Sequence, residues 1–541
     1  MNRRRFLKAA VLIGIGAVVM LSGCGKKTQK PNILFIMSDD HTAQAIGVYN
    51  DRFAKLNPTP TIDRLAKEGM LFENVFCTNS ICTPSRACIM TGQYNHVNGV
   101  LDLDGELSQD RHYLVIEMKK AGYQTAIIGK WHLKVEPIHF DYYNVLPGQG
   151  KYHNPEFREK GKGQWPDNIV RTQGHSSDVI TDASLAWLDK RDTTRPFFLL
   201  HHFKAPHDMF ENAQRYDNYL ADTNFPEPEN MWNQPDWGSV ATRGENDSLI
   251  HIIGSSIGKR NIIRNMGMHM NVDPSLPDDE YKRQAYRRYM QRYFRCVKGV
   301  DDNLKRLFDY LEKNNLMDNT VIIYTGDQGF FLGEHDFIDK RWMYEEAMRM
   351  PFLVRYPKII KPGSRCNWLI NNTDFAPTMM ELAGVRTPAY MQGMSFKSAL
   401  FGENEPAGWR KATYYRYWMH MAHQHNNPAH FGIRTKRYKL IFFYGTDWTD
   451  GSVFGESRYR NRPKNAIQVD NRFWADTPAG WEFYDMENDP HEMKNQYKNP
   501  AYQQVISELK EQLKKERAAL KEIDDQFPKI KKIIEKYWDS Y

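Results

Sequence analysis

Paired cysteines are absent from this sequence. Six cysteines occur in 541 residues, and none of them shows the C-x-x-C spacing of a zinc site. Internal repeats and low-complexity tracts are absent as well. Because 41% of the residues are hydrophobic and 13% are aromatic, we expect a globular protein with one large domain and a smaller companion.

A strong net charge is also lacking. The formal charge of +7 is modest for 541 residues, and no RNP, zinc-finger or basic-helix pattern accompanies it. We therefore expect no nucleic-acid partner. The small positive excess favours the approach of an anionic substrate, such as a polyanionic glycan, through long-range attraction.

The first residues predict export. Arg3-Arg4-Arg5-Phe6-Leu7-Lys8 resembles a twin-arginine signal, and the apolar run that follows, Ala9–Leu21, is too short for a comfortable membrane span. Leu21-Ser22-Gly23-Cys24 resembles a bacterial lipobox, whose cysteine is lipidated after cleavage. An ordinary secretory signal with an incidental cysteine is the alternative. The prediction is a signal peptide at residues 1–23, lipidation at Cys24, a tether at 24–31, and a periplasmic or outer-membrane lipoprotein of the bacterial envelope.

The other cysteines leave the disulfide question open. Cys296 lies on an apolar helical stripe and is expected to be a packed thiol, as is Cys88. In an oxidising compartment a disulfide among Cys77, Cys88 and Cys366 would be allowed.

Continuous apolar runs predict buried parallel strands. Asn32–Ser38 ends in Asp39-Asp40, and Thr320–Gly326 ends in Asp327-Gln328. Helical patterns separate such runs, so we predict an α/β fold with a large, mostly parallel central sheet sandwiched by helices. Ligands of such sheets collect beyond the carboxyl ends of the strands. Further predicted strands are Gln124–Ile128, Pro196–His201 and Phe352–Tyr356.

The pattern changes after Gly393. Short aromatic runs predict a small antiparallel sheet, and a terminal helix with one apolar face, from Val505 to Leu520, is expected to dock on it. The weakly periodic stretch from Arg215 to Glu280 predicts a long insertion of loops. The predicted sheet strands are Ala412–Tyr417, Tyr438–Tyr444 and Trp481–Tyr484. We expect a catalytic domain at residues 32–400 and a C-terminal α+β subdomain at 401–541.

The acidic pairs at the strand ends predict a metal site. A hard divalent cation prefers oxygen ligands, and a parallel sheet can bring two strand ends together. Asp39, Asp40, Asp327 and Gln328 would then hold one calcium ion. The alternative is that Asp39-Asp40 merely caps a helix.

One cysteine lies in a distinctive local sequence, Cys82-Thr83-Pro84-Ser85-Arg86, followed by Thr91-Gly92. Thr83 is predicted as the N-cap and Pro84 as the first helical residue, which puts Cys82 just before a helix. An anion there would meet unpaired backbone N–H groups. A buried structural thiol is the alternative. The pattern resembles the signature that marks a cysteine for conversion to formylglycine in sulfatases.

Almost the whole chain resembles the type I, formylglycine-dependent sulfatases of the alkaline phosphatase superfamily. The stretches Lys204–His207, Phe225–Pro228 and Gly326–Lys340 are similar to bacterial N-acetylglucosamine-6-sulfatases and glycosaminoglycan sulfatases. The other matching pieces occur in the family's order: Gly129–Leu133, Ala205–His207, Gly333–His335, Lys340 with Tyr344–Glu346, and Tyr484–Met486 with Asp489-Pro490.

The resemblance implies a mechanism. The aldehyde made from Cys82 is hydrated, one hydroxyl attacks sulfur while the ester oxygen leaves, and the second hydroxyl loses its proton and expels sulfate. Many relatives carry Asn or His where this chain has Gln328. The implied metal ligands are Asp39, Asp40, Asp327, Gln328 and the modified Cys82. Arg86, Lys130 and Lys340 would offset charge, Arg86 and His132 would position the hydrated aldehyde, and His207 would protonate the leaving alcohol.

The histidines His420, His423, His425 and His430 lack the spacing of a helical zinc motif. Within the resemblance this stretch lies where the smaller domain approaches the pocket. His425 and His430 are therefore predicted to contact the sugar, together with His207 and Lys340. His335 is expected to have either a structural role or a role near the substrate.

We thus predict an exported bacterial sulfatase that removes sulfate from glycosaminoglycans or other sulfated carbohydrates. Its partners would be the saccharide and a formylglycine-generating maturation enzyme, with membrane contact only through the lipid anchor. One alternative is a phosphonate monoester or phosphodiester hydrolase of the same superfamily. Another is a catalytically silent glycan-binding lipoprotein, which would have no need of every catalytic side chain named above.

Overall fold

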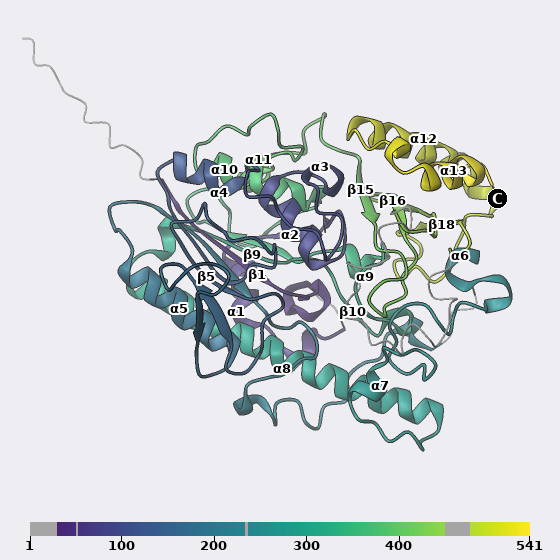
Figure 1. Cartoon of the computed structure of the whole chain (residues 1–541), viewed down its shortest axis with the longest axis horizontal. Coiled ribbons are helices and arrows are strands. Elements are labelled where there is room, and N and C mark those ends of the chain that lie inside the picture. Colours follow the sequence, from purple (N-terminus) through teal and green to yellow (C-terminus); the bar gives the residue numbers. More distant parts are fainter. Residues whose placement is uncertain (1–29, 50–51, 233–235, 449–475, 541) are drawn as a thin grey trace, which may run out of the picture. The chain divides into compact units, whose positions relative to one another are not determined.

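A ten-stranded sheet forms the centre of the protein (Figure 1). The computed structural model describes residues 30–49, 52–232, 236–448 and 476–540. The strand order is β13-β2-β12-β9-β1-β8-β4-β5-β6-β7. Four adjacent central strands are parallel: β9 (Thr320–Gly326), β1 (Asn32–Ser38), β8 (Phe197–Phe203) and β4 (Gln124–Lys130). The flanking strands are β13 (Ser364–Cys366), β2 (Met70–Phe72), β12 (Phe352–Arg355), β5 (Tyr142–Leu146), β6 (Glu156–Glu159) and β7 (Ile169–Arg171).

The central strands are buried on both faces, which explains their continuous apolar sequences. In β1, Ile33, Phe35 and Met37 belong to one hydrophobic core, whereas Leu34 and Ile36 belong to another. Register pairs Ser38 of β1 with Gly326 of β9. The residues that follow these two strands, including both predicted acidic pairs, therefore emerge at the same edge of the sheet.

Helices cover the two faces of the sheet (Figure 1). One face carries α1 (Pro60–Glu68), α5 (Ser176–Lys190) and α8 (Asp278–Lys313), and the other carries α2 (Cys82–Thr91), α4 (Leu114–Lys120) and α10 (Phe375–Leu382). The α/β sandwich predicted from the sequence is confirmed. Helix α8 contains the predicted apolar stripe, and Cys296 is buried on it.

A four-stranded antiparallel sheet forms the C-terminal part, in the order β15-β16-β17-β18. Helix α12 (Gln503–Ala519) docks on it as predicted, joined by α13 (Pro528–Tyr537), which the sequence analysis did not find. The strands are β15 (Ala412–Tyr417), β16 (His430–Thr435), β17 (Tyr438–Phe443) and β18 (Gly480–Asp485). Both sheets belong to one compact unit, Pro31–Tyr541. The boundary predicted at residue 400 divides two parts of that unit and stays a prediction.

Short elements complete the described chain. Between Arg215 and the start of α8, the described residues contain α6 (Val240–Arg243) and α7 (Met266–His269) among turns, which is the loop-rich insertion expected. The remaining short helices are α3 (Asn95–Asn98), α9 (Glu345–Met348) and α11 (Lys397–Leu400). The remaining strands are β3 (Val75–Phe76), β14 (Ile370–Asn371), β10 (Phe331–Leu332) and β11 (Ile338–Asp339).

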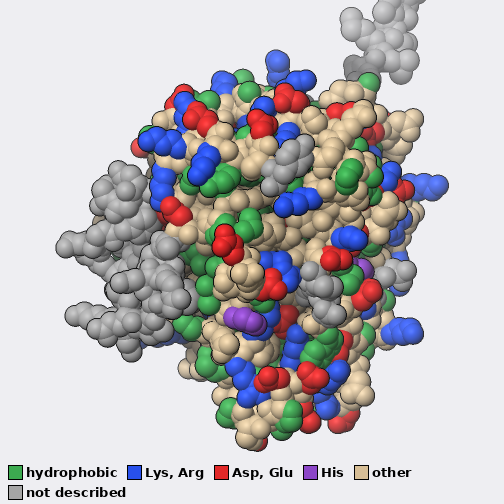
Figure 2. Space-filling model, turned by 90° about the vertical axis from the view of Figure 1, so that its right-hand side faces the viewer, with side chains coloured by type: hydrophobic (Ala, Val, Ile, Leu, Met, Phe, Trp, Pro, Cys, Tyr) green, Lys and Arg blue, Asp and Glu red, His purple; other side chains and the backbone are tan. Residues whose placement is uncertain are grey.

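The surface shows no large area of one charge on the face drawn in Figure 2, where Lys and Arg side chains are interspersed with Asp and Glu. This distribution fits the modest net charge of +7. In the described chain, no helix is long and apolar enough to cross a membrane. The predicted signal peptide, Cys24 and most of the tether lie outside the described residues.

Candidate active site

Cys82 is the first residue of helix α2, which begins two residues earlier than predicted. Ile81 is extended, with φ −152° and ψ 142°, and its carbonyl accepts a hydrogen bond from the Ser85 N–H at 3.0 Å. The prediction that Thr83 caps this helix is wrong, because the extended residue at the N-cap is Ile81 and Thr83 already lies in the first turn. The Thr83 hydroxyl lies 3.5 Å from Nδ1 of His132 instead. The helix N-terminus and its unpaired N–H groups are thus at Cys82.

The Cys82 thiol is buried, with 1% of the residue exposed. Its Sγ donates to Oδ1 of Asp39 at 3.4 Å. Burial raises the pKa of Cys82 to about 12, so the unmodified side chain is a neutral thiol at physiological pH and a poor nucleophile.

Three carboxylates meet beside this thiol. Asp39, Asp40 and Asp327 are fully buried, and each offers an oxygen within 4.8 Å of the others. The Asp40 N–H donates to Oδ1 of Asp327 at 3.1 Å, which ties the two strand ends together. Gln328 donates its amide N–H to Asp40, while its buried Oε1 has no hydrogen-bond partner among the described residues. An unpartnered carbonyl oxygen beside three carboxylates is a donor set that suits a hard cation.

Three cations contact these carboxylates, and Arg86 contacts two of them, Asp39 at 3.4 Å and Asp327. Lys130 pairs with Asp39, Arg86 NH2 lies 3.0 Å from Oδ2 of Asp327, and Lys340 Nζ lies 2.6 Å from Oδ2 of Asp40. Although burial opposes its charge, the neighbouring Asp40 carboxylate raises the pKa of Lys340 above its ordinary value. Lys340 is therefore charged throughout the physiological pH range.

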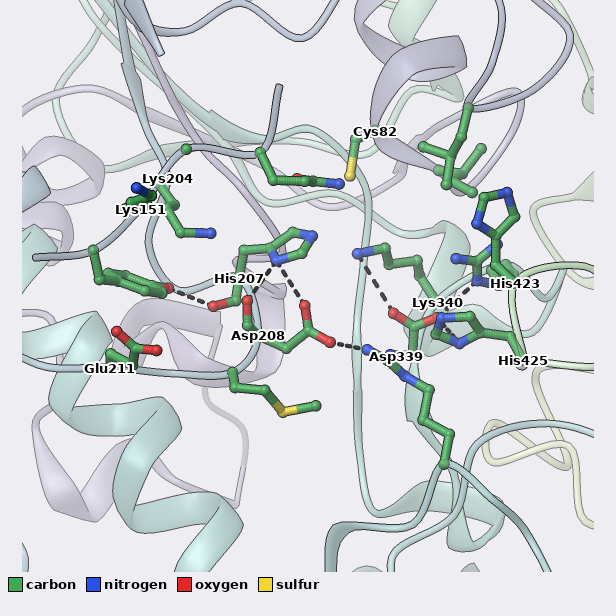
Figure 3. A pocket seen from close by; sticks show the side chains of 18 of the residues that line it. Cys82, Lys151, Lys204, His207, Asp208, Glu211, Asp339, Lys340, His423 and His425 are labelled. Atoms are coloured by element: carbon green, nitrogen blue, oxygen red, sulfur yellow. Dashed lines mark hydrogen bonds and ion pairs between the residues drawn. The ribbon is translucent and has the colours of Figure 1, made fainter. Parts of the chain in front are cut away.

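His207 faces this cluster from the loop after β8. Its Nε2 is 3.7 Å from Oδ2 of Asp40, and its Nδ1 is 2.7 Å from Oδ1 of Asp208. The other Asp208 oxygen pairs with Arg264, and the Tyr152 hydroxyl donates to the His207 carbonyl. Burial, with nearby Lys340, lowers the pKa of His207 well below its ordinary value. Asp208 thus holds the ring through Nδ1 (Figure 3), Tyr152 holds the backbone of the same residue, and Nε2 is left on the side of Asp40.

A cavity of about 730 Å³ opens above the cluster, with Cys82, His207 and Lys340 on its wall (Figure 3). Arg86, Lys130, His132 and the three carboxylates are not among its lining residues and lie beneath this layer. The cavity is lined by Ile81, Cys82, Leu103, Gln149, Gly150, Lys151, Tyr152, His153, Lys204, His207, Asp208, Met209, Glu211, Arg264, Asp339, Lys340, Arg341, His423 and His425.

His425 lies on the wall opposite Lys204, where the sequence analysis expected a sugar contact. Its Nδ1 is 2.8 Å from Oδ2 of Asp339 and 2.8 Å from Oγ of Ser255. Arg341 donates its Nε–H to the same Asp339 oxygen at 2.9 Å. This wall therefore offers a carboxylate, a guanidinium and an imidazole to the hydroxyl groups of a ligand.

His430 does not reach the cavity, contrary to prediction. It is fully buried, and its ring packs 5.6 Å from the Tyr415 ring and 6.1 Å from the Trp342 ring. Its position at the start of β16 points the side chain into the core. His335 is also a core residue, 1% exposed and 5.2 Å from the Trp237 ring, so of its two expected roles the structural one fits.

Several wall residues were not singled out from the sequence. Asp208, Arg264, Asp339 and Arg341 carry no motif of their own, although Asp339 lies inside the Gly326–Lys340 stretch. The five described cysteines are free thiols, so Cys77, Cys88 and Cys366 form no disulfide among themselves. The Cys77 Sγ lies 3.2 Å from the Ser80 hydroxyl instead.

Comparison with known proteins gives several matches. A family described as Sulfatase matches residues 31–385, and one described as N-sulphoglucosamine sulphohydrolase, C-terminal, matches residues 333–452 and 470–519. An N-acetylglucosamine-6-O-sulfatase of Bacteroides thetaiotaomicron is 37% identical over 94% of this chain and 90% of its own. An arylsulfatase of Clostridium perfringens is 25% identical over 90% of this chain and 94% of its own. The solved structure of BT4656 in complex with its substrate D-glucosamine-2-N,6-O-disulfate matches with a TM-score of 0.77 and 35% identity, covering 92% of this chain and 99% of that one.

Proposed function

Because this chain belongs to the sulfatase family of sulfuric ester hydrolases, we propose that it removes the 6-O-sulfate from glucosamine residues of a glycosaminoglycan-like substrate. The chemistry would use a formylglycine made from Cys82 and one calcium ion. The observation that carries the proposal is the position of Cys82. It lies at a helix N-terminus on the cavity wall, with its Sγ 3.4 Å from Asp39 in a cluster of three carboxylates and three cations.

The residues present fit a calcium ion. Asp39, Asp40, Asp327 and Gln328 would hold it through oxygen atoms, and the unpartnered Oε1 of Gln328 supports that assignment. When bound, calcium supplies positive charge next to the sulfate oxygens and to the nucleophile at position 82.

The side chains of this protein would perform the remaining work. Arg86 and Lys130 hold the carboxylates in place beneath the cavity, and Lys340 presents charge to the sulfate oxygens from the cavity wall. His132 and Arg86 position the modified residue 82. His207 would give a proton to the departing sugar oxygen through Nε2 from its doubly protonated form, which the Asp208 carboxylate beside Nδ1 favours against the effect of burial on the pKa. Burial around these groups keeps bulk water away from the reacting bonds.

The substrate class rests on the relatives and on the opposite wall. The 37% identical relative is named an N-acetylglucosamine-6-O-sulfatase, and the 35% identical structure contains a glucosamine disulfate. Asp339, Arg341 and His425 could bind the hydroxyl groups of such a sugar from the side opposite His207. The Asp339 carboxylate can accept a hydrogen bond from one sugar hydroxyl, and the Arg341 guanidinium can donate one to the neighbouring hydroxyl. An aryl ester has no such pair of hydroxyls, so this wall favours a sugar.

The test is sulfate release by protein whose Cys82 conversion has been confirmed by peptide mass. We expect release from N-acetylglucosamine-6-O-sulfate at a kcat/KM at least tenfold above that for 2-O-, 3-O- and 4-O-sulfated sugars. Preferential release from another position would contradict the 6-O assignment. Faster hydrolysis of a phosphodiester or phosphonate monoester than of any sulfate ester would favour the alternative chemistry of the superfamily.

Two further proposals concern covalent modification of the chain, at Cys82 and at Cys24. A maturation enzyme would convert Cys82, and a lipid on Cys24 would anchor the chain in the bacterial envelope, as the Leu21–Cys24 lipobox supports. Labelling with a radioactive fatty acid should mark the wild type and not Cys24→Ala. Unlabelled wild-type protein would contradict the anchor.

A further inference from the structure

Lys204 is a buried lysine whose ammonium group has no acceptor among the described residues. Only 5% of the residue is exposed. No carboxylate of the described residues lies within 4.0 Å of its Nζ, which instead faces the ring of Tyr152, 4.6 Å from the ring centroid. Burying an ammonium group without an acceptor is costly, so an unpaired one in a cavity wall indicates that a partner arrives with the ligand.

The other buried lysines of the described chain show the contrast. Each has an acceptor within the protein. Lys130 pairs with Asp39, Lys340 with Asp40, Lys439 with Glu492, and Lys510 donates to the Trp538 carbonyl. Lys204 forms no ion pair of this kind, although the more distant carboxylates of Asp40 and Glu211 partly oppose the effect of burial on its pKa.

Lys204 lies where a ligand would meet it. Figure 3 shows its ammonium group in the cavity on one side of His207, with Lys151 on the same side, while Lys340 and His425 lie on the other. Glu211 lines the same wall without forming an ion pair with it. Burial lowers the pKa of Lys204 to about 8, which leaves most of the amine charged at neutral pH.

Lys204 is also separate from the cations of the carboxylate cluster. Arg86, Lys130 and Lys340 each contact at least one cluster carboxylate, and Lys204 forms an ion pair with none of them. A substrate with one sulfate group would leave Lys204 without a partner while occupying the others.

We propose that Lys204, supported by Lys151 at the cavity rim, binds a second anionic group of the substrate, distinct from the sulfate that is removed. This inference rests on the proposed function. The oxyanion recognised is either a sulfo group on another position of the same glucosamine or the carboxylate of a neighbouring uronic acid. A substrate with both charges would be preferred over a singly charged one.

The experiment compares kcat/KM for three substrates in converted enzyme: N-acetylglucosamine-6-O-sulfate, glucosamine-2-N,6-O-disulfate, and a disaccharide that joins 6-O-sulfated N-acetylglucosamine to a uronic acid. The preference is the ratio of a doubly charged substrate to the singly charged one. We expect Lys204→Gln to lower this ratio by about 10- to 100-fold, the effect of losing one charge-assisted hydrogen bond. If the ratio falls for the disulfate, the second anion is a sulfo group on the same sugar; if it falls for the disaccharide, the second anion is the uronic acid carboxylate.

Two variants serve as controls. Lys204→Arg keeps the positive charge and should retain most of the preference. Lys160→Gln removes a lysine that lies 6.0 Å from the centroid of Tyr143 outside the cavity, and it should leave the ratio unchanged. An equal fall in kcat/KM for all three substrates in Lys204→Gln would overturn the proposal, because the lysine would then act on the scissile sulfate or on the fold.

A binding measurement separates this inference from the 6-O assignment. Titration calorimetry with glucosamine-2-N-sulfate and with glucuronic acid needs no turnover. We expect at least one of them to bind the wild type at least tenfold more tightly than Lys204→Gln. If wild type releases no 6-O-sulfate but shows this difference, the 6-O assignment fails and the anion subsite stands. Equal affinity of the two proteins for both ligands would refute the subsite.

Discussion

Replacing Asp208 with asparagine tests how the protein orients its proposed proton donor. The Asp208 carboxylate lies 2.7 Å from Nδ1 of His207, and its other oxygen is held by Arg264. Burial of the His207 ring and the positive charge of nearby Lys340 both disfavour the protonated ring and lower its pKa. A carboxylate on Nδ1 opposes this effect and keeps Nε2 directed at the leaving oxygen. The asparagine variant preserves the volume and removes the charge.

The expected loss follows from the contact removed. A buried hydrogen bond to a charged group contributes about 1.5–3 kcal/mol, which corresponds to about 10- to 100-fold in rate. Only a poor leaving group needs the proton, so kcat for a sugar sulfate should fall by this factor while kcat for 4-nitrophenyl sulfate changes much less. Steady-state kinetics on both substrates provides the assay.

Two results would refute this reasoning. An equal loss on the sugar and on the aryl sulfate would show that Asp208 supports the fold of the cavity and not proton transfer. No loss on either would show that His207 is held without Asp208. Arg264→Met is the companion variant, and it should shift the sugar rate in the same direction, because it frees the Asp208 side chain.

Four other outcomes are expected. Cys82→Ala should abolish sulfate release while the thermal midpoint falls by only a few degrees, since a small buried side chain is shortened by one atom. When calcium is added to wild-type protein from which metal has been removed with a chelator, the thermal midpoint should rise. Gln328→Ala should reduce that rise, measured by differential scanning calorimetry. Glu522→Gln should lower the free energy of unfolding by about 3 kcal/mol at pH 7. Burial raises the pKa of Glu522, but the charge of Arg416 outweighs that effect and holds the pKa at about 2 instead of 4.5. That stabilisation is present above pH 4.5 and is lost as the pH falls towards 2, so urea unfolding at pH 3 should show a smaller gap between variant and wild type. His425→Ala should raise KM for a sugar sulfate more than it changes kcat for an aryl sulfate, and equal changes would contradict a sugar contact.

Much of the fold was predictable from local sequence. The continuous apolar runs of β1 and β9 appear as buried parallel strands with the predicted bounds, because a strand buried on both faces needs no polar alternation. The start of α2 was missed by two residues. Its N-terminus depends on the backbone of Ile81, and a Thr-Pro pair also fits inside a first turn.

The candidate site was predictable in part. The acidic residues after β1 and β9 were expected to meet, since neighbouring parallel strands end at one edge of the sheet. The positions of the histidines could not be predicted, because His425 and His430 are only five residues apart. In the fold His430 begins β16 and enters the core, whereas His425 lies in the turn before that strand and lines the cavity.

The sequence by itself determined the chemistry available at the site: a cysteine in a formylglycine-type signature, acidic pairs at two strand ends, and the lysines and histidines of the family. Only the tertiary structure decided which of these groups remain unpaired. Asp208 is matched by Arg264 and Lys340 by Asp40, whereas Lys204 has no acceptor in the described chain. Charge pairing in a folded protein depends on distances of a few ångströms between residues far apart in the sequence, and no local pattern encodes those distances.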